Sequence, residues 1–448
     1  MKIQKNGLVI GATAFVLATV AIPGILPHLP GVAFFKDSPK ELVDEVWQVV
    51  DRFYVDGTFN QKDWRAIRKQ YLQKNYKTKE EVYKATRLML KNLGDPYTRF
   101  MDPKEFRDLQ VETSGQLIGV GIQLSQNEKT KKLEVIAPIE DTSASKAGIL
   151  SKDIITKIDG KSTTGMDVNQ AVQLIRGKEG TSVTLTVQRD GSQVIDFKLL
   201  RQQIEIHPVE AKYRPKELGG IGYIRLKQFS ANAATEMGTA IQKLESQGAT
   251  GYVLDLRSNP GGLLYGAIDI ARMWLDEGKI VSTKNRQGEG DVNSANRTAI
   301  TKKPLVVLVD GGSASASEIL SGALQDNKRA QLVGTTTFGK GLVQSVRPLS
   351  DGAGMAVTIA RYYTPSGKDI NHSGIKPDIE LKLTKAQIKE LVKDRTKFAT
   401  AADPQYAKAL QTLQVAIAKS GGSTAQKDRK STRLNSSHPS ISRMPSSA

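Results

Sequence analysis

The stretch that decides the fold is PLVVLVDGGSASASEILSGALQ, residues 304–325. It opens with a continuous apolar run, which is typical of a parallel strand buried on both faces. Its second half, SEILSGALQ (317–325), has the apolar spacing of a helix. A second pair of the same kind, GYVLDL (251–256) followed by LLYGAIDIARMWL (263–275), repeats the alternation. Together they predict an α/β layer domain over residues 201–382.

The turns after these two strands are where we expect chemistry, because reactive groups in open α/β sheets collect past the carboxyl ends of strands. The first turn, RSNPGG (257–262), lets backbone N–H groups approach a ligand closely. The second, DGGSASASE (310–318), places three serines at a helix N-terminus, whose N–H groups suit a developing oxyanion. This pattern leaves Ser313, Ser315 and Ser317 all open as the nucleophile, and equally as simple helix caps.

A nucleophilic serine needs a base, and Lys340 in GTTTFGKG (334–341) is the candidate. Apolar neighbours would bury its amine and lower the pKa, and serine–lysine pairs are a known variant of the catalytic triad. His372, in a polar loop, is the only histidine in the catalytic half of this domain. The same octapeptide fits seven of eight positions of the nucleotide-binding P-loop, but Gly341 stands where that site needs a hydroxyl.

Gln344 follows Lys340 by four residues, so local conformation decides whether the two side chains meet. In an extended segment their Cα atoms would lie roughly 13 Å apart. In a helical turn they would be neighbours at about 6 Å. A hydrogen bond from Gln344 that orients the amine therefore requires a helical turn here. An ordinary surface glutamine is the alternative.

Two further regions precede the α/β domain, and one follows it. Residues 38–112 predict a helical domain, with a cap at Thr78 and Gly94 closing its helix. Residues 113–200 combine short alternating strands with one helix over 167–175, which predicts a compact, partly open barrel. Residues 383–420 predict the C-terminal helices.

The barrel resembles a PDZ domain, because IGVGI (118–122) matches the carboxylate-binding loop and ASKAGI (144–149) the short helix. In such a loop, successive N–H groups hold the carboxylate of a peptide that adds as an extra strand. A plain tight turn is the alternative. The implied substrate-binding residues are Gly119, Val120, Gly121 and Ile122.

Longer motifs resemble the carboxyl-terminal processing proteases, in the family's own order of helical region, PDZ domain and protease core. They are GSASASEILSGALQDNKRAQLVG, TFGKGLVQSV, DLRSNPGGLL and LGDPYTRFMDP (93–103). The resemblance is strongest to cyanobacterial and plastid members. It implies an α+β multidomain protein whose α/β protease core is of the ClpP/crotonase-like type.

The resemblance also implies roles for single residues. Ser315 becomes the nucleophile, Lys340 the general base and Gln344 the residue that orients the lysine. The N–H groups of Gly261 and Ala316 form the oxyanion hole. No metal or cofactor is implied.

Beyond the catalytic centre, the resemblance implies that Arg176 helps to couple the PDZ domain to the active site. The implied function is a serine endopeptidase that removes C-terminal tails from exported precursors, the photosystem II reaction-centre precursor among the possible substrates. A catalytically silent, PDZ-based peptide-binding or chaperone protein is the alternative.

The composition and the sequences of the two chain ends limit these interpretations. The chain has no cysteine, which excludes disulfides and thiol nucleophiles, and its net charge is +18. The charge is not interleaved with stacking aromatics, so we expect no nucleic-acid partner. Residues 1–33 have the basic start and apolar run of a signal peptide or membrane anchor, which predicts export to the thylakoid lumen or periplasm. Residues 428–448 resemble a translated sequencing adapter, and we expect them to be extraneous.

Overall fold

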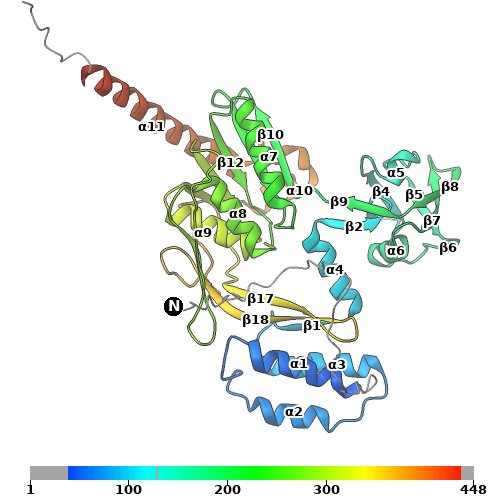
Figure 1. Ribbon diagram of the computed structural model, residues 1–448. Helices are drawn as coiled ribbons and strands as arrows, with labels where there is room; N and C mark the ends of the chain where they lie inside the picture. The colour runs from blue at the N-terminus through cyan, green and yellow to red at the C-terminus, as the bar shows by residue number, and fades with distance from the viewer. Residues whose placement is uncertain (1–38, 128–129, 435–448) are drawn as a thin grey trace, which may run out of the picture. The chain divides into compact units, whose positions relative to one another are not determined.

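The computed structural model describes residues 39–127 and 130–434. The predicted targeting segment and most of the expected adapter-derived tail lie outside the described residues. The chain divides into two compact units (Figure 1). The small unit comprises Asp108–His207 and Ser230–Asn232, and the large unit comprises the remaining described residues.

The large unit is built on a six-stranded sheet with one antiparallel edge strand and five parallel strands. The central strands β12 (Gly251–Asp255) and β15 (Leu305–Val309) are buried at every residue, as their continuous apolar runs predict. The other strands are β10 (Val209–Arg214), β11 (Ile221–Leu226), β16 (Ala330–Gly334) and β19 (Ile379–Glu380). Across the sheet the order is β10, β11, β12, β15, β16 and β19.

Helices cover both faces of this sheet, which confirms the mixed α/β layering predicted from the sequence. Alternate residues of the inner strands belong to two separate cores. One core is shared with α7, α8 and α9, and the other with α11. The covering helices are α7 (Ala233–Ser246), α8 (Leu264–Trp274), α9 (Ala316–Asp326) and α11 (Pro404–Leu434), with α10 (Lys385–Lys393) and η2 (Arg395–Lys397) preceding the last.

A second sheet of the large unit supports the N-terminal helices. Its strands are β1 (Arg99–Met101), β13 (Lys279–Lys284), β14 (Val292–Ser294), β17 (Leu342–Pro348) and β18 (Gly354–Tyr363). Helices α1 (Pro39–Phe53), α2 (Trp64–Leu72) and α3 (Lys79–Leu90), followed by η1 (Lys91–Leu93), share a core with Met355 and Val357 of β18. Thr78 caps α3 and accepts from Glu81 N, while Gly94 ends η1 at φ 65°, as the sequence predicts.

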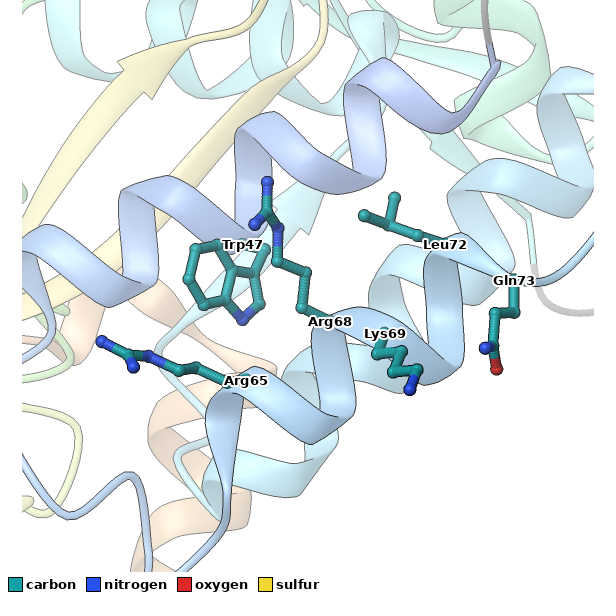
Figure 2. A pocket seen from close by; sticks show the side chains of 6 residues that line it. All are labelled: Trp47, Arg65, Arg68, Lys69, Leu72 and Gln73. Atoms are coloured by element: carbon teal, nitrogen blue, oxygen red, sulfur yellow. The ribbon is translucent and has the colours of Figure 1, made fainter.

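A hollow of about 420 Å³ lies on the N-terminal helices, beside the Trp47 ring (Figure 2). Its cations are not all free to bind a ligand, because Arg68 pairs with Asp44 and lies 4.7 Å from the Trp47 ring centroid. The lining residues are Trp47, Arg65, Arg68, Lys69, Leu72 and Gln73.

Most of the small unit falls within residues 113–200, which contain short strands and a helix close to the predicted range 167–175. Helix α6 (Val168–Ile175) carries a capping box at Asp167 and packs beside strand β3 (Ile122–Gln126), which is an edge strand of its sheet. The other elements are α4 (Pro103–Ser114, which begins in the large unit), β2 (Gln116–Gly119), β4 (Leu133–Pro138), α5 (Ser143–Lys146), β5 (Ile154–Ile158), β6 (Lys161–Ser162), β7 (Ser182–Arg189), β8 (Gln193–Leu200) and β9 (Gln202–Glu205).

A buried ion cluster ties the segment before α11 to the turn after β12. The Arg257 guanidinium, 3% exposed, donates to Asp255 at 2.7 Å and to Asp403 at 2.8 Å, and both carboxylates are fully buried. The same guanidinium lies 4.2 Å from the centroid of the Phe398 ring. The turn that contains the expected oxyanion residue Gly261 is therefore anchored to the segment before α11.

We expect Asp403→Asn to lower the melting temperature by about 5–10 °C. The amide nitrogen would replace an oxygen that accepts from Arg257 and from Ala399 N, and each buried donor left unsatisfied costs about 1–3 kcal/mol. Differential scanning calorimetry measures the change. Asp269→Asn is the matched control, since its pair with Arg272 is largely exposed and should be worth less than about 1 kcal/mol. Equal shifts in the two variants would contradict this interpretation.

Candidate active site

Three adjacent parallel strands bring the predicted site residues to one edge of the sheet. The turns after β12, β15 and β16 hold residues 257–262, 310–315 and 335–341. Because neighbouring parallel strands end at the same edge, these turns meet there. The register pairs Val309 of β15 directly with Gly334 of β16.

The structure separates the three serines that the sequence pattern leaves open. Ser313 and Ser317 are fully buried, and their hydroxyls donate to backbone carbonyls, at 2.8 Å to Leu256 O and at 2.9 Å to Asn259 O. Both serines therefore hold the turns together. Ser315 is the partly exposed member of the three, as a nucleophile must be.

Ser315 lies in a strained backbone conformation at the N-terminus of α9. Its φ of 53° and ψ of −113° fall in a region that L-residues rarely adopt and that costs about 1–3 kcal/mol. The facing turn explains why the position is held. A Cβ on Gly261, whose φ is 100°, would lie 2.6 Å from Ala314 O and 3.0 Å from Ser315 Cβ.

The expected oxyanion donors differ in their availability. Ala316 N is the first nitrogen of α9, and N–H groups in the first turn of a helix have no partner within it. The N–H of Gly261 instead donates to Asn259 Oδ1 at 2.9 Å. Gly261 lies beside the helix start, since its Cβ position is 2.9 Å from Ala316 N. To serve as the second donor, it would have to release Asn259.

The Lys340 amine has the environment of a base. Burial is the largest influence on its pKa and lowers it, and the nearby Arg99 lowers it further. Asp95 and Glu318 act in the opposite direction without cancelling the decrease. After Gly341 the chain enters strand β17 rather than a helix, so the nucleotide-binding interpretation of this loop is wrong.

A buried carboxylate links the backbones of Ser315 and Lys340. Glu318 is fully buried, and one of its oxygens accepts from Ser315 N at 2.8 Å and from Lys340 N at 2.9 Å. These two nitrogens can therefore lie no more than 5.7 Å apart, the two distances laid end to end. The other oxygen accepts from Thr337 Oγ1 at 2.6 Å and from Gly339 N at 2.7 Å.

A tyrosine makes a second link between the same two residues. The Tyr362 ring is 1% exposed, and its hydroxyl donates to Lys340 O and lies 3.2 Å from Ser315 O. Within residues 39–127 and 130–434, no hydrogen bond joins the Lys340 amine to the Ser315 hydroxyl. The amine instead lies 4.8 Å from the centroid of the Tyr97 ring. The two backbones are thus held together while the side chains are not yet bonded.

Gln344 does not lie in the helical turn that a direct bond to Lys340 was expected to require. It belongs to strand β17, with a register shift between Val343 and Gln344. Its Nε2 donates to Thr358 Oγ1 at 3.4 Å, and Thr358 donates to Asp95 at 2.6 Å. The expectation of a helical turn is wrong, because antiparallel pairing with β18 fixes the segment as a strand.

The loop expected to bind a carboxylate has a suitable backbone in the small unit. Val120 O accepts from Ala144 N at 2.9 Å, and Gly121 O accepts from Ile139 N at 2.8 Å. Each carbonyl points away from the N–H of its own peptide, so the N–H groups of Gly121 and Ile122 face the other side. Gly121 has a φ of 86° that favours glycine, and β3 leads from this loop as an open edge strand.

Arg176 lies just after α6 and bonds within the small unit. Its backbone N donates to Val172 O at 2.9 Å, and its guanidinium is 3.3 Å from Asp108 Oδ1. Both side chains are partly exposed. The pair joins the end of α6 to Asp108 of α4, the helix that leads into the small unit.

Comparisons with known proteins agree with this geometry. Residues 220–381 match peptidase family S41, and residues 134–189 match the PDZ domain. The chain is 45% identical over 395 residues to the carboxyl-terminal-processing protease of Synechocystis, covering 88% of this chain and 91% of that protein. It is 38% identical to carboxyl-terminal-processing peptidase 3 of Arabidopsis thaliana chloroplasts, covering 75% of this chain and 67% of the relative. A solved photosystem II D1 C-terminal processing protease superposes with a TM-score of 0.53 at 37% identity, covering 83% of this chain and all of that one.

The chain belongs to the carboxyl-terminal processing proteases of peptidase family S41. As a member of that family it is a serine-type peptidase, and the resemblance inferred from its motifs is confirmed. The catalytically silent alternative is not favoured.

The sequence reading of this protease missed Glu318, Tyr362 and Tyr97. A local signal for Glu318 was present, because Ser315 and Glu318 have the S-x-x-E spacing of a capping box. Tyr97 and Tyr362 carry no such signal. They reach Lys340 from positions 243 residues before it and 22 residues after it, and only the tertiary fold brings them there.

We expect Glu318→Gln to lower kcat of this protease by at least about 100-fold with KM changed less than about twofold. The amide nitrogen would face N–H donors, and small displacements at a reacting centre cost about that much. Steady-state kinetics on a peptide substrate measures the effect. Glu80→Gln, an exposed glutamate in the first turn of α3, is the control. Full activity in Glu318→Gln would show that the carboxylate does not position the pair.

Proposed function

We propose that Ser315 and Lys340 cleave the C-terminal extensions of exported precursor proteins by acyl transfer. The observation that supports this most directly is the pair of links, through Glu318 and Tyr362, that hold both backbones at the strained start of α9. Lys340, with its pKa lowered by burial, takes the proton of Ser315 as the hydroxyl oxygen attacks the scissile carbonyl carbon.

The resulting oxyanion is held by the N–H of Ala316 at the positive end of α9, with the N–H of Gly261 as the second donor once it leaves Asn259. Collapse of the tetrahedral intermediate breaks the C–N bond, and the Lys340 ammonium gives its proton to the leaving amine. Water then releases the acyl group by the same steps. Gln344 acts on this lysine through Thr358 and Asp95 rather than directly.

The small unit supplies substrate recognition in this proposal. A free carboxylate binds the N–H groups of Gly119 to Ile122 while the peptide extends along β3. Arg176 connects the end of α6 to Asp108 on the segment entering the unit, a placement suited to coupling. A precursor like that processed by the solved D1 protease is a fitting substrate.

The proposal also includes the domain bounds, the type of protease core and the cellular location that the sequence predicts. They are a helical domain over 38–112, a PDZ domain over 113–200, a ClpP/crotonase-like core over 201–382 with helices over 383–420, and export to the thylakoid lumen or periplasm. The curated relatives in cyanobacteria and chloroplasts support the location. No helix in the described part of the chain is both long enough and apolar enough to cross a membrane. Anchoring would therefore rest on residues 1–33.

We expect Ser315→Ala and Lys340→Ala each to lower cleavage of a peptide with a free C-terminus by at least about 1000-fold, because each removes one half of the proton transfer. Mass spectrometry of the products measures this. Lys376→Ala, an exposed lysine downstream of the site, is the matched control and should leave the rate unchanged.

The same peptide with an amidated C-terminus tests recognition by the small unit. We expect it to bind and react at least about tenfold more weakly, since the N–H loop loses its anionic partner.

If Lys340→Ala kept most of the activity, the proposed base would be wrong. Binding of the free peptide without hydrolysis would favour the peptide-binding alternative.

A further inference from the structure

Tyr97 lies beside the base without any assigned role. The Lys340 amine is 4.8 Å from the centroid of its ring, a distance at which a cation is attracted to the aromatic face. Tyr97 is contributed by the segment between η1 and β1, far from Lys340 in sequence. Neither the family comparisons nor the proton transfer proposed above uses it.

The backbone that carries the ring is fixed by hydrogen bonds of its own segment. Asp95 accepts from Tyr97 N at 2.9 Å and from Thr98 Oγ1 at 2.7 Å. Thr98 is 4% exposed, and its hydroxyl also accepts from Thr358 N at 3.0 Å, which binds the segment to strand β18. The fold therefore holds the backbone from which the partly buried ring projects.

We propose that Tyr97 is a positioning residue whose ring face stabilises the ammonium that Lys340 becomes when it accepts the Ser315 proton. The inference rests on the proposed function, since it assigns Lys340 as the base. In the step concerned, the Ser315 O–H bond breaks, an N–H bond forms on the amine, and the serine oxygen bonds to the substrate carbonyl carbon. The proton later leaves with the amine of the cleaved peptide.

A ring suits this task better than a carboxylate. An adjacent carboxylate typically favours the charged amine by more than a pKa unit and so keeps it protonated before the reaction. An aromatic face attracts the cation with less energy and accepts no conventional hydrogen bond. The amine can therefore leave the ring and reach the serine hydroxyl without breaking an ion pair.

The other charged and polar groups around the amine are less suited than the ring to stabilising the ammonium. Arg99, on β1, repels the ammonium, while Asp95 and Glu318 attract it from two other elements. Glu318 already accepts four hydrogen bonds and Asp95 accepts from Tyr97, Thr98 and Thr358, and none of these is from the Lys340 amine. Tyr362 contacts the carbonyl of Lys340, not its amine.

The test compares Tyr97→Leu, which removes the aromatic face, with Tyr97→Phe, which keeps it and removes only the hydroxyl. The ring favours the charged amine, so its loss lowers the pKa of Lys340. Because the neutral amine is the base, the acid limb of kcat/KM should move to lower pH by roughly half a pH unit in Tyr97→Leu. At the plateau kcat should fall about 2- to 5-fold, whereas Tyr97→Phe should match the unaltered protein in both respects.

A second readout does not depend on turnover. In full-length protein carrying Ser315→Ala, the rate at which acetic anhydride labels Lys340, followed by peptide mass spectrometry across pH, reports the pKa of the amine. Adding Tyr97→Leu should move this titration down by the same half unit, and adding Tyr97→Phe should not. Melting temperature establishes that each variant is folded.

Two results would overturn the inference. One is a Tyr97→Leu variant whose labelling titration and plateau kcat equal those of the unaltered protein. The other is a Tyr97→Phe variant that loses as much as Tyr97→Leu, which would assign the effect to the hydroxyl. Failure of the proposed function itself would look different. Lys340→Ala would remain active while the labelling titration still shifted with Tyr97.

Discussion

The active site depends on a single buried carboxylate. Glu318 has no accessible surface, and removing a carboxylate from water costs several kcal/mol unless donors replace the lost hydration. Here three backbone N–H groups and one hydroxyl do so, at 2.6–2.9 Å, within the positive potential at the start of α9. Two of the donors are the backbone nitrogens of Ser315 and Lys340. The charge is satisfied only when both turns are in place.

This arrangement fixes the backbones of Ser315 and Lys340 more firmly than their side chains. Glu318 and Tyr362 both bind main-chain atoms of Ser315 and Lys340, while the amine lies against Tyr97. A small rotation of a lysine side chain is cheap compared with moving a strained turn at the end of a buried strand. The scaffold is therefore built in advance, and the proton transfer needs only side-chain motion.

The sequence predicted the parts of this structure whose signals are local. Continuous apolar runs identified β12 and β15, because strands buried on both faces have no polar alternation. The cap at Thr78 and the helix after Asp167 followed from short-range hydrogen bonding. The segment around Gln344 is a strand rather than the expected helical turn, for the opposite reason. Its conformation is set by pairing along β18, a partner that no four-residue spacing reveals.

The choice among the three serines shows where residue-level prediction ends. Ser313, Ser315 and Ser317 are equivalent in the sequence pattern, and only the turn after β12 distinguishes them. It does so by accepting hydrogen bonds from two of them and by bringing a glycine against the third.

That turn is itself positioned by Arg257, which pairs with Asp255 and with Asp403 just before α11. The geometry of Ser315 thus depends on a residue 88 positions further along the chain. The segment before α11 is therefore part of what holds Ser315 in its strained conformation, and the site is a property of the large unit rather than of its motifs.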